Sequence, residues 1–255
     1  GLGGTMLPVV LLPGLMAAGI GSLVYMGLGS ITGLSKAAYA IQPLALSPIG
    51  ELTIPMFAWI ILLAPIAALF GHAVVEGGGN VAKIVSGRPM LLVPLAGAVV
   101  AVCAILFAAI TGENDYVVLF SGSRALNPIV EQTATLSAGT LAVLLILKGI
   151  AWGISMGSFR GGPVFPAIFL GTAGGLLASY LPGLPDGAAI AIVMGAVVVA
   201  VLRLPLAAVV VTLLLTSGAG AAATPLIIIA VVISHLIVQT LRARESADEP
   251  VASPV

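Results

Sequence analysis

Continuous apolar runs are the feature that most limits how this chain can fold. Seven of them are long enough, or nearly so, to cross a hydrocarbon core, which takes roughly 20 helical residues. They are unbroken, whereas the strands of a membrane barrel alternate between apolar and polar residues. The runs lie at Met6–Leu28, Ile54–Val75, Met90–Thr111, Leu136–Met156, Val164–Leu181, Ala188–Leu215 and Pro225–Leu241. The sequence therefore predicts an all-α, polytopic helical membrane protein.

Proline, glycine and charged residues divide these runs, and they predict short, broken and re-entrant helices. Backbone outside a helix survives at membrane depth only where it is buried in protein or lines a polar cavity. Broken helices that face a shared site are typical of channels and transporters. The predicted interruptions are Pro13-Gly14, the mixed segment Gly29–Leu52, the end of a helix at Gly77-Gly78-Gly79, a basic loop at Lys83–Pro89, the short segment Leu126–Thr135, Arg203-Leu204-Pro205 and Ser217–Gly220.

Charge and cysteine content exclude several classes of function. Only 7% of the 255 residues are charged and the formal net charge is zero, which argues against a nucleic-acid partner. The single cysteine, Cys103, lies inside an apolar run, where a buried and inert thiol is expected. We expect no metal, and no cofactor beyond a bound chloride or another small anion.

The segment Gly157–Gly171 carries the strongest functional signal. It lies between two apolar runs, with small residues first, then Pro163 and an apolar stretch from Val164, which together predict the start of a helix. Such a start directs unpaired N–H groups and the positive end of the helix dipole at its surroundings. Gly161 and Gly162 allow an ion to approach that backbone closely. An anion is the occupant that this arrangement favours; a glycine-rich turn buried between two helices is the alternative.

These residues resemble a known family. Gly161-Gly162-Pro163-Val164-Phe165-Pro166, followed by Phe169-Leu170-Gly171, is similar to the G-x-F-x-P signature of the CLC chloride channels and transporters. The resemblance continues in register through Met194-Gly195-Ala196 and Arg203-Leu204-Pro205-Leu206, and it is specific from Ser137 to Leu241. It implies that residues 1–244 form a CLC-like transmembrane domain, followed by a short polar tail at 245–255.

The same resemblance implies that the chain is the second half of a CLC subunit. Two other family signatures, G-S-G-I-P and G-K/R-E-G-P, are absent, and the sequence begins at Gly1 instead of a methionine. We therefore expect a fragment that needs a missing N-terminal half to function. Because CLC proteins are homodimers, a homodimer is also expected, with the span near Leu7–Leu28 at the contact between subunits.

Departures from the family pattern bear on mechanism. Two consecutive backbone amides of the family bind the central chloride, and Pro163 here has no N–H, which leaves Val164 of that pair. The pore tyrosine after the last long helix and the glutamates that accompany proton coupling have no counterpart. These changes favour a passive anion channel over proton-coupled exchange. The anion-binding residues we predict are Ser158, Arg160, Gly161, Gly162, Val164 and Phe165.

Other ionisable residues are expected to have structural roles. Lys148 lies inside an apolar run, where a charge should face protein or water, and Glu131 is its predicted partner. His72 and Glu76 are four residues apart on one helix face, which predicts a hydrogen bond between them. An intramembrane metal-dependent enzyme using His72, Glu76 and His235 is an alternative, although the chain has no H-E-x-x-H motif. A non-conducting, degenerate CLC-like protein is the other alternative.

Basic residues near the ends of the runs predict the orientation in the membrane. Lys83 with Arg88, Arg203, and Arg242 with Arg244 fall on one side if the runs alternate in direction, and the acidic Gly112–Asp115 loop falls on the other. We therefore expect an integral protein of the plasma (inner) membrane with a cytoplasmic C-terminus, whose partners are the lipid bilayer and a small inorganic anion.

Overall fold

The computed structural model describes residues 7–33, 42–132 and 135–248. It divides into two units, Gly1–Gln42 and Pro43–Val255. In the first unit, α1 (Leu7–Thr32) is a single helix with Pro13 inside it. The predicted interruption at Pro13-Gly14 is therefore wrong, and apolar membrane helices tolerate such prolines more readily than soluble ones do.

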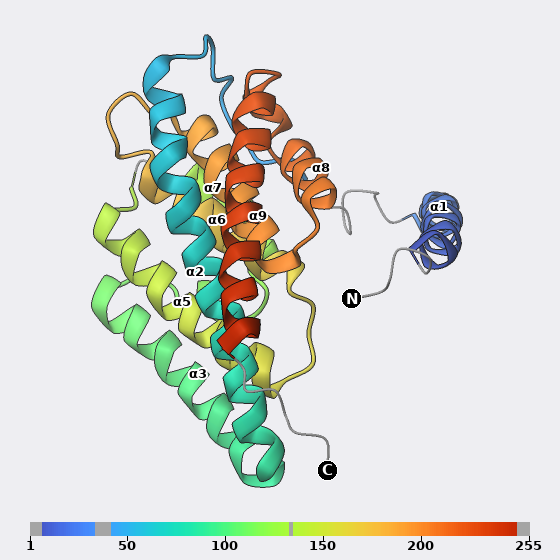
Figure 1. The fold of residues 1–255 in the computed structure, drawn as a ribbon, viewed down its shortest axis with the longest axis vertical. Helices are drawn as coiled ribbons and strands as arrows, with labels where there is room; N and C mark the ends of the chain where they lie inside the picture. The colour runs from blue at the N-terminus through green and yellow to red at the C-terminus, as the bar shows by residue number, and fades with distance from the viewer. Residues whose placement is uncertain (1–6, 34–41, 133–134, 249–255) are drawn as a thin grey trace. The chain divides into compact units, whose positions relative to one another are not determined.

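The second unit is built from helices joined by short irregular segments (Figure 1). Four of its described helices are long and apolar enough to cross a membrane, as expected for a polytopic helical membrane protein. The long helices are α2 (Ile54–Gly87), α3 (Pro89–Thr111), α5 (Ala138–Ser158) and α9 (Ala223–Asp248). The shorter elements are η2 (Asp115–Val117), η3 (Ser123–Ala125), α4 (Leu126–Glu131), α6 (Val164–Ala178), α7 (Asp186–Leu202), α8 (Pro205–Leu215) and η4 (Ser217–Ala219).

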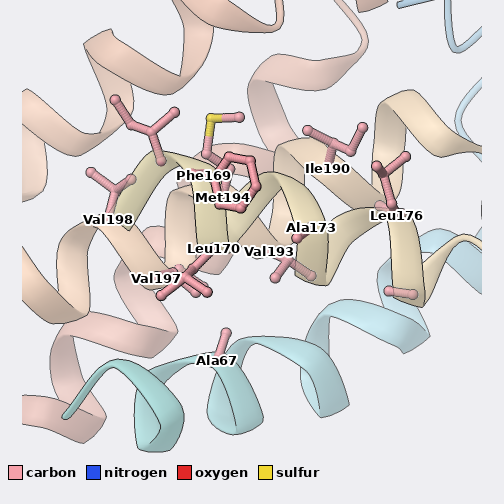
Figure 2. Packing of buried hydrophobic residues seen from close by; sticks show 14 of the residues in the cluster. Ala67, Phe169, Leu170, Ala173, Leu176, Ile190, Val193, Met194, Val197 and Val198 are labelled. Carbon is pink, nitrogen blue, oxygen red and sulfur yellow. The ribbon is translucent and has the colours of Figure 1, made fainter. Parts of the chain in front are cut away.

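Helices α6 and α7 form the centre of this unit. Every residue of α7 from Gly187 to Val201 is buried, which is why the helix is apolar on all sides. Figure 2 shows Phe169, Leu170 and Ala173 of α6 interleaved with side chains of α7. At 15 and 17 residues, the two helices are about 22 and 25 Å long at 1.5 Å per residue. Both are shorter than a hydrocarbon core of roughly 30 Å.

Two glycines of α6 allow its backbone to touch α7. A Cβ built on Gly171 would lie 2.5 Å from the Cα of Met194, and one on Gly175 would lie 2.4 Å from the Cα of Ile190. Neither backbone could yield without separating the helices. Small residues at helix contacts are the usual means of close packing in membranes, and here they bring the backbone of α6 into direct contact with α7.

The glycines of α2 serve packing and do not end the helix. The sequence predicts a stop at Gly77-Gly78-Gly79 and a loop at Lys83–Pro89, but α2 continues to Gly87 and only Arg88 separates it from α3. A Cβ on Gly78 would lie 2.7 Å from Met156 Cε, and one on Gly157 would lie 2.4 Å from the Gly78 carbonyl oxygen. Both stop and loop predictions are therefore wrong, because α5 packs against this stretch of α2.

The predicted breaks nearer the C-terminus are confirmed. Arg203 adopts the left-handed conformation between α7 and α8, with φ 60°, and η4 separates α8 from α9. The segment from Leu126 is a helix of six residues, too short to cross a membrane.

Part of the mixed segment Gly29–Leu52 lies outside the described residues. In its remainder, the N–H groups of Leu44 and Ile49 bond to the carbonyls of Leu215 and Ala219.

We predict that Gly175→Ala lowers the stability of the protein by roughly 1–3 kcal/mol or more, because overpacking forces α6 away from α7. Thermal unfolding in detergent measures the change. Gly77→Ala is the matched control, because a Cβ at that helical position meets nothing within 4 Å. Equal melting temperatures for the two variants would contradict the close contact between α6 and α7.

Candidate anion site

The start of α6 and the end of α5 lie on either side of a short irregular segment. Helix α5 ends at Ser158, Phe159 is extended (φ −118°, ψ 161°), and α6 begins at Val164 after Pro163. Proline at the entry of a helix is tolerated because the first N–H groups have no partner within the helix. The predicted helix start at Val164 is thus confirmed, and the segment presents one helix N-terminus.

The first turn of α6 leaves two backbone donors unused by the helix. Pro163 and Pro166 carry no N–H, and the N–H of Ala167 bonds to the carbonyl of Pro163 at 3.2 Å. Within the described residues, the N–H groups of Val164 and Phe165 make no hydrogen bond. With the helix dipole they form a small region of positive potential.

A cavity of about 230 Å³ lies beside this turn. It is bounded by residues of the α5–α6 segment, one face of α5, the loop after α3, and α3 itself. They are Val100, Val118, Phe120, Ser121, Lys148, Ala151, Trp152, Ser155, Met156, Phe159, Arg160, Gly161, Gly162, Pro163 and Pro166. The charged residues among them are Lys148 and Arg160, so the cavity has a positive lining.

The predicted site residues are divided between this cavity and its surroundings. Arg160, Gly161 and Gly162 line it, and a Cβ built on either glycine meets nothing within 4 Å. Val164 and Phe165 do not line it, although their N–H groups belong to the adjoining turn. Ser158 is also outside the lining, and its Oγ is buried without a hydrogen bond in the described part of the chain.

Arg160 is exposed. Among the residues that the structure describes, its guanidinium makes no hydrogen bond and no ion pair. The guanidinium therefore does not bond to the carbonyls at the C-terminal end of α5. A guanidinium with free donors beside a low-dielectric cavity attracts anions.

Lys148 is the lining residue whose surroundings the sequence does not reveal. Its side chain is 1% exposed, and Nζ donates to the carbonyls of Val118, Leu119 and Phe120 at 2.9, 2.8 and 2.7 Å. The prediction that Glu131 pairs with Lys148 is wrong, because Glu131 lies on α4 and is exposed. An ammonium group has three donors, so three carbonyls satisfy it and leave its positive charge beside the cavity.

The loop that receives Lys148 is tightly fitted. Phe120 has φ 54° and Gly122 has φ 80°, and a Cβ on Gly122 would lie 2.5 Å from the ring of Phe169. Lys148 Nζ also lies 5.3 Å from the centre of that ring, within the range of a cation–π contact. The sequence identified Lys148 as a charge that must face protein. It could not identify the partners, because they are backbone carbonyls, which residues of every type possess.

The predicted hydrogen bond between His72 and Glu76 is wrong. His72 Nε2 instead lies 2.8 Å from Glu245 Oε1 on α9, and Glu76 Oε1 lies 3.8 Å from Arg203 Nη2. Ligand atoms of His72, Glu76 and Glu245 lie within 4.8 Å of one another, a spacing that a metal ion could bridge. The Arg203 guanidinium already supplies a positive charge there, and His235 is not in this cluster: it contacts Gln239.

One comparison with known proteins gives a match. The family model described as "Voltage gated chloride channel" matches residues 2–239. The comparisons with curated proteins and with solved structures give no significant match. The chain belongs to the voltage gated chloride channel family, a family of helical membrane proteins, and its membership supports anion transport in general.

We predict that Lys148→Met destabilises the protein by roughly 1–3 kcal/mol, because the carbonyl of Val118 is left buried without a partner, which costs about that much. The denaturation midpoint in detergent measures this, and the rate of trypsin cleavage after Arg124 reports on the released loop. Lys83→Met, at an exposed position of α2, is the control. Unchanged cleavage after Arg124 in Lys148→Met would show that the three bonds do not hold the loop.

Proposed function

We propose that this protein conducts a small anion, chloride in the first instance, passively through the membrane at the start of α6. The observation that carries the proposal is the combination of two unused backbone donors with a cavity lined by Lys148 and Arg160. In this proposal Val164 and Phe165 donate to the ion, Gly161 and Gly162 allow its approach, and Arg160 and Lys148 supply the field. Fixed dipoles of this kind replace the hydration shell of an ion.

Passive conduction is supported over proton coupling by the absence of a carboxylate from the residues that line the cavity. A coupled exchanger moves protons through titratable groups near the anion, and Lys148 has all three donors engaged. The alternative of a metal-dependent enzyme using His72, Glu76 and His235 is not supported, because His235 is not in the cluster of His72, Glu76 and Glu245. The family's members are transport proteins.

The assembly is also part of the proposal. We infer that residues 1–244 correspond to the second half of a family subunit, that a first half completes the pore, and that two such subunits form a homodimer. The basic residues near the helix ends support a cytoplasmic C-terminus in the inner membrane. Ser158 is retained as a hydroxyl near the ion path, since its buried Oγ is without a partner among the described residues.

The test is chloride efflux from liposomes, with and without a proton ionophore, for the chain alone and for the chain joined to the first half. Electrogenic efflux without proton movement supports the proposal. Proton uptake in a fixed ratio to chloride would replace the channel with an exchanger. No anion flux from any form would favour the non-conducting alternative.

We predict that Arg160→Ala lowers the efflux rate severalfold, because the local concentration of anions falls when one positive charge leaves the mouth of the cavity. The reduction should shrink as ionic strength rises. Arg124→Ala, which removes an exposed loop arginine outside this cavity, is the control. Equal efflux from the two variants would remove Arg160 from the anion path.

Pro163→Ala offers a test in the opposite direction. The substitution restores an N–H at the entry of α6, and the φ of −82° at position 163 suits alanine. A hydrogen bond to an ion is worth roughly 1.5–3 kcal/mol, so chloride affinity should rise about tenfold or more. Anion-concentration dependence of efflux measures it. Pro185→Ala, just before α7, is the control, and an unchanged affinity in Pro163→Ala would place the ion elsewhere.

A further inference from the structure

A second positive pocket lies on α9, away from the α6 cavity. It has a volume of about 500 Å³ and is lined by Arg203, His235, Val238, Gln239, Arg242 and Ala243. None of these residues lines the cavity beside α6. Arginine, histidine and glutamine supply its polar surface, and no acidic side chain is among the lining residues. The pocket is therefore suited to a negatively charged ligand.

Arg203 is held in place by the break between α7 and α8. Its left-handed backbone, φ 60° and ψ 24°, ends α7, and its N–H bonds to the carbonyl of Val199 at 2.8 Å. Non-glycine residues adopt this conformation at a cost of about 1–2 kcal/mol. On one side its Nη2 lies 3.8 Å from Glu76 Oε1. That contact orients the guanidinium from outside the pocket, because Glu76 is not a lining residue.

The other polar residues come from one face of α9. His235, Gln239 and Arg242 are spaced four and three residues apart, the spacing that places helical side chains on one face. The ring of His235 and the amide of Gln239 are in hydrogen-bond contact at 2.8 Å. Both therefore keep one further polar atom for a ligand.

Arg242 carries a charge that the described chain does not neutralise. In the part of the chain that the structure describes, it makes no hydrogen bond and no ion pair. The nearby acid on its own helix, Glu245, is paired with His72 at 2.8 Å. The two arginines repel one another electrostatically, and an anion between them would remove that repulsion.

We propose that this pocket binds a phosphate group. Two guanidinium forks match the paired oxygens of phosphate and hold it by charge-assisted hydrogen bonds. A bare chloride ion occupies only a small part of about 500 Å³. Arg242 lies in the last turns of an apolar helix whose candidate span is Ala223–Glu245, where a phospholipid headgroup and a soluble phosphate ester are both within reach. The shared chemistry is the phosphate group.

The experiment uses the whole chain and two probes. In detergent, the melting temperature is measured with inorganic phosphate and with chloride at matched ionic strength. In nanodiscs, native mass spectrometry measures retained lipid with phosphatidylglycerol and with phosphatidylcholine. Arg242→Gln is the test variant, and Arg244→Gln, two residues along the same helix and outside the pocket lining, is the matched control. His235→Ala is a second test variant that keeps both arginines.

The expected result is a probe-dependent rise in the melting temperature or in lipid retention. Arg242→Gln should lower the affinity for the probe about tenfold or more, since a charge-assisted bond is worth roughly 1.5–3 kcal/mol. Arg244→Gln should leave the affinity unchanged. Arg242-dependent retention of phosphatidylglycerol identifies a lipid headgroup, whether or not inorganic phosphate also acts, and a phosphate effect without lipid retention identifies a soluble ester. Equal losses of probe affinity in Arg242→Gln and Arg244→Gln, or no effect of either probe, would overturn the proposal of a phosphate site. Neither result depends on chloride flux.

Discussion

The contact between α6 and α7 is the constraint on which the rest of the structure depends. Lipid offers no hydrogen bonds, so a helix that starts at membrane depth needs protein around it. Helix α7 provides that protein along its whole buried length. Gly171 and Gly175 bring the two backbones together, and this contact fixes the level at which Val164 and Phe165 present their N–H groups. The proposed anion site is thus a consequence of packing elsewhere on α6.

Lys148 extends this arrangement to a residue of α5 that lines the cavity. A buried ammonium group is stable only when its donors are satisfied, and it obtains three carbonyls from one loop. The loop in turn packs Gly122 against Phe169 of α6. One charge therefore ties α5, the loop and α6 into a single unit. It leaves the cavity positive, although all three of its donors are already used by the loop.

The sequence predicts helices well and partners poorly, for physical reasons. Apolar length and proline position determine where a helix can lie, so the break at Arg203 and the start at Val164 could be read directly. Glycine is ambiguous: Gly77-Gly78-Gly79 looks like a helix end, yet Gly78 serves the contact with α5. Partners across helices, such as Glu245 for His72 and the loop carbonyls for Lys148, depend on tertiary packing that residue spacing does not encode.

Two of the breaks between helices carry an arginine that lines a cavity. Arg160 lies between α5 and α6, and Arg203 lies between α7 and α8. A break frees backbone groups and removes a turn of apolar side chains, which makes room for a polar cavity. The two sites differ in what accompanies the arginine. Unused N–H groups beside Arg160 suit a small ion that must leave again, whereas a second guanidinium beside Arg203 suits a larger ligand that remains bound.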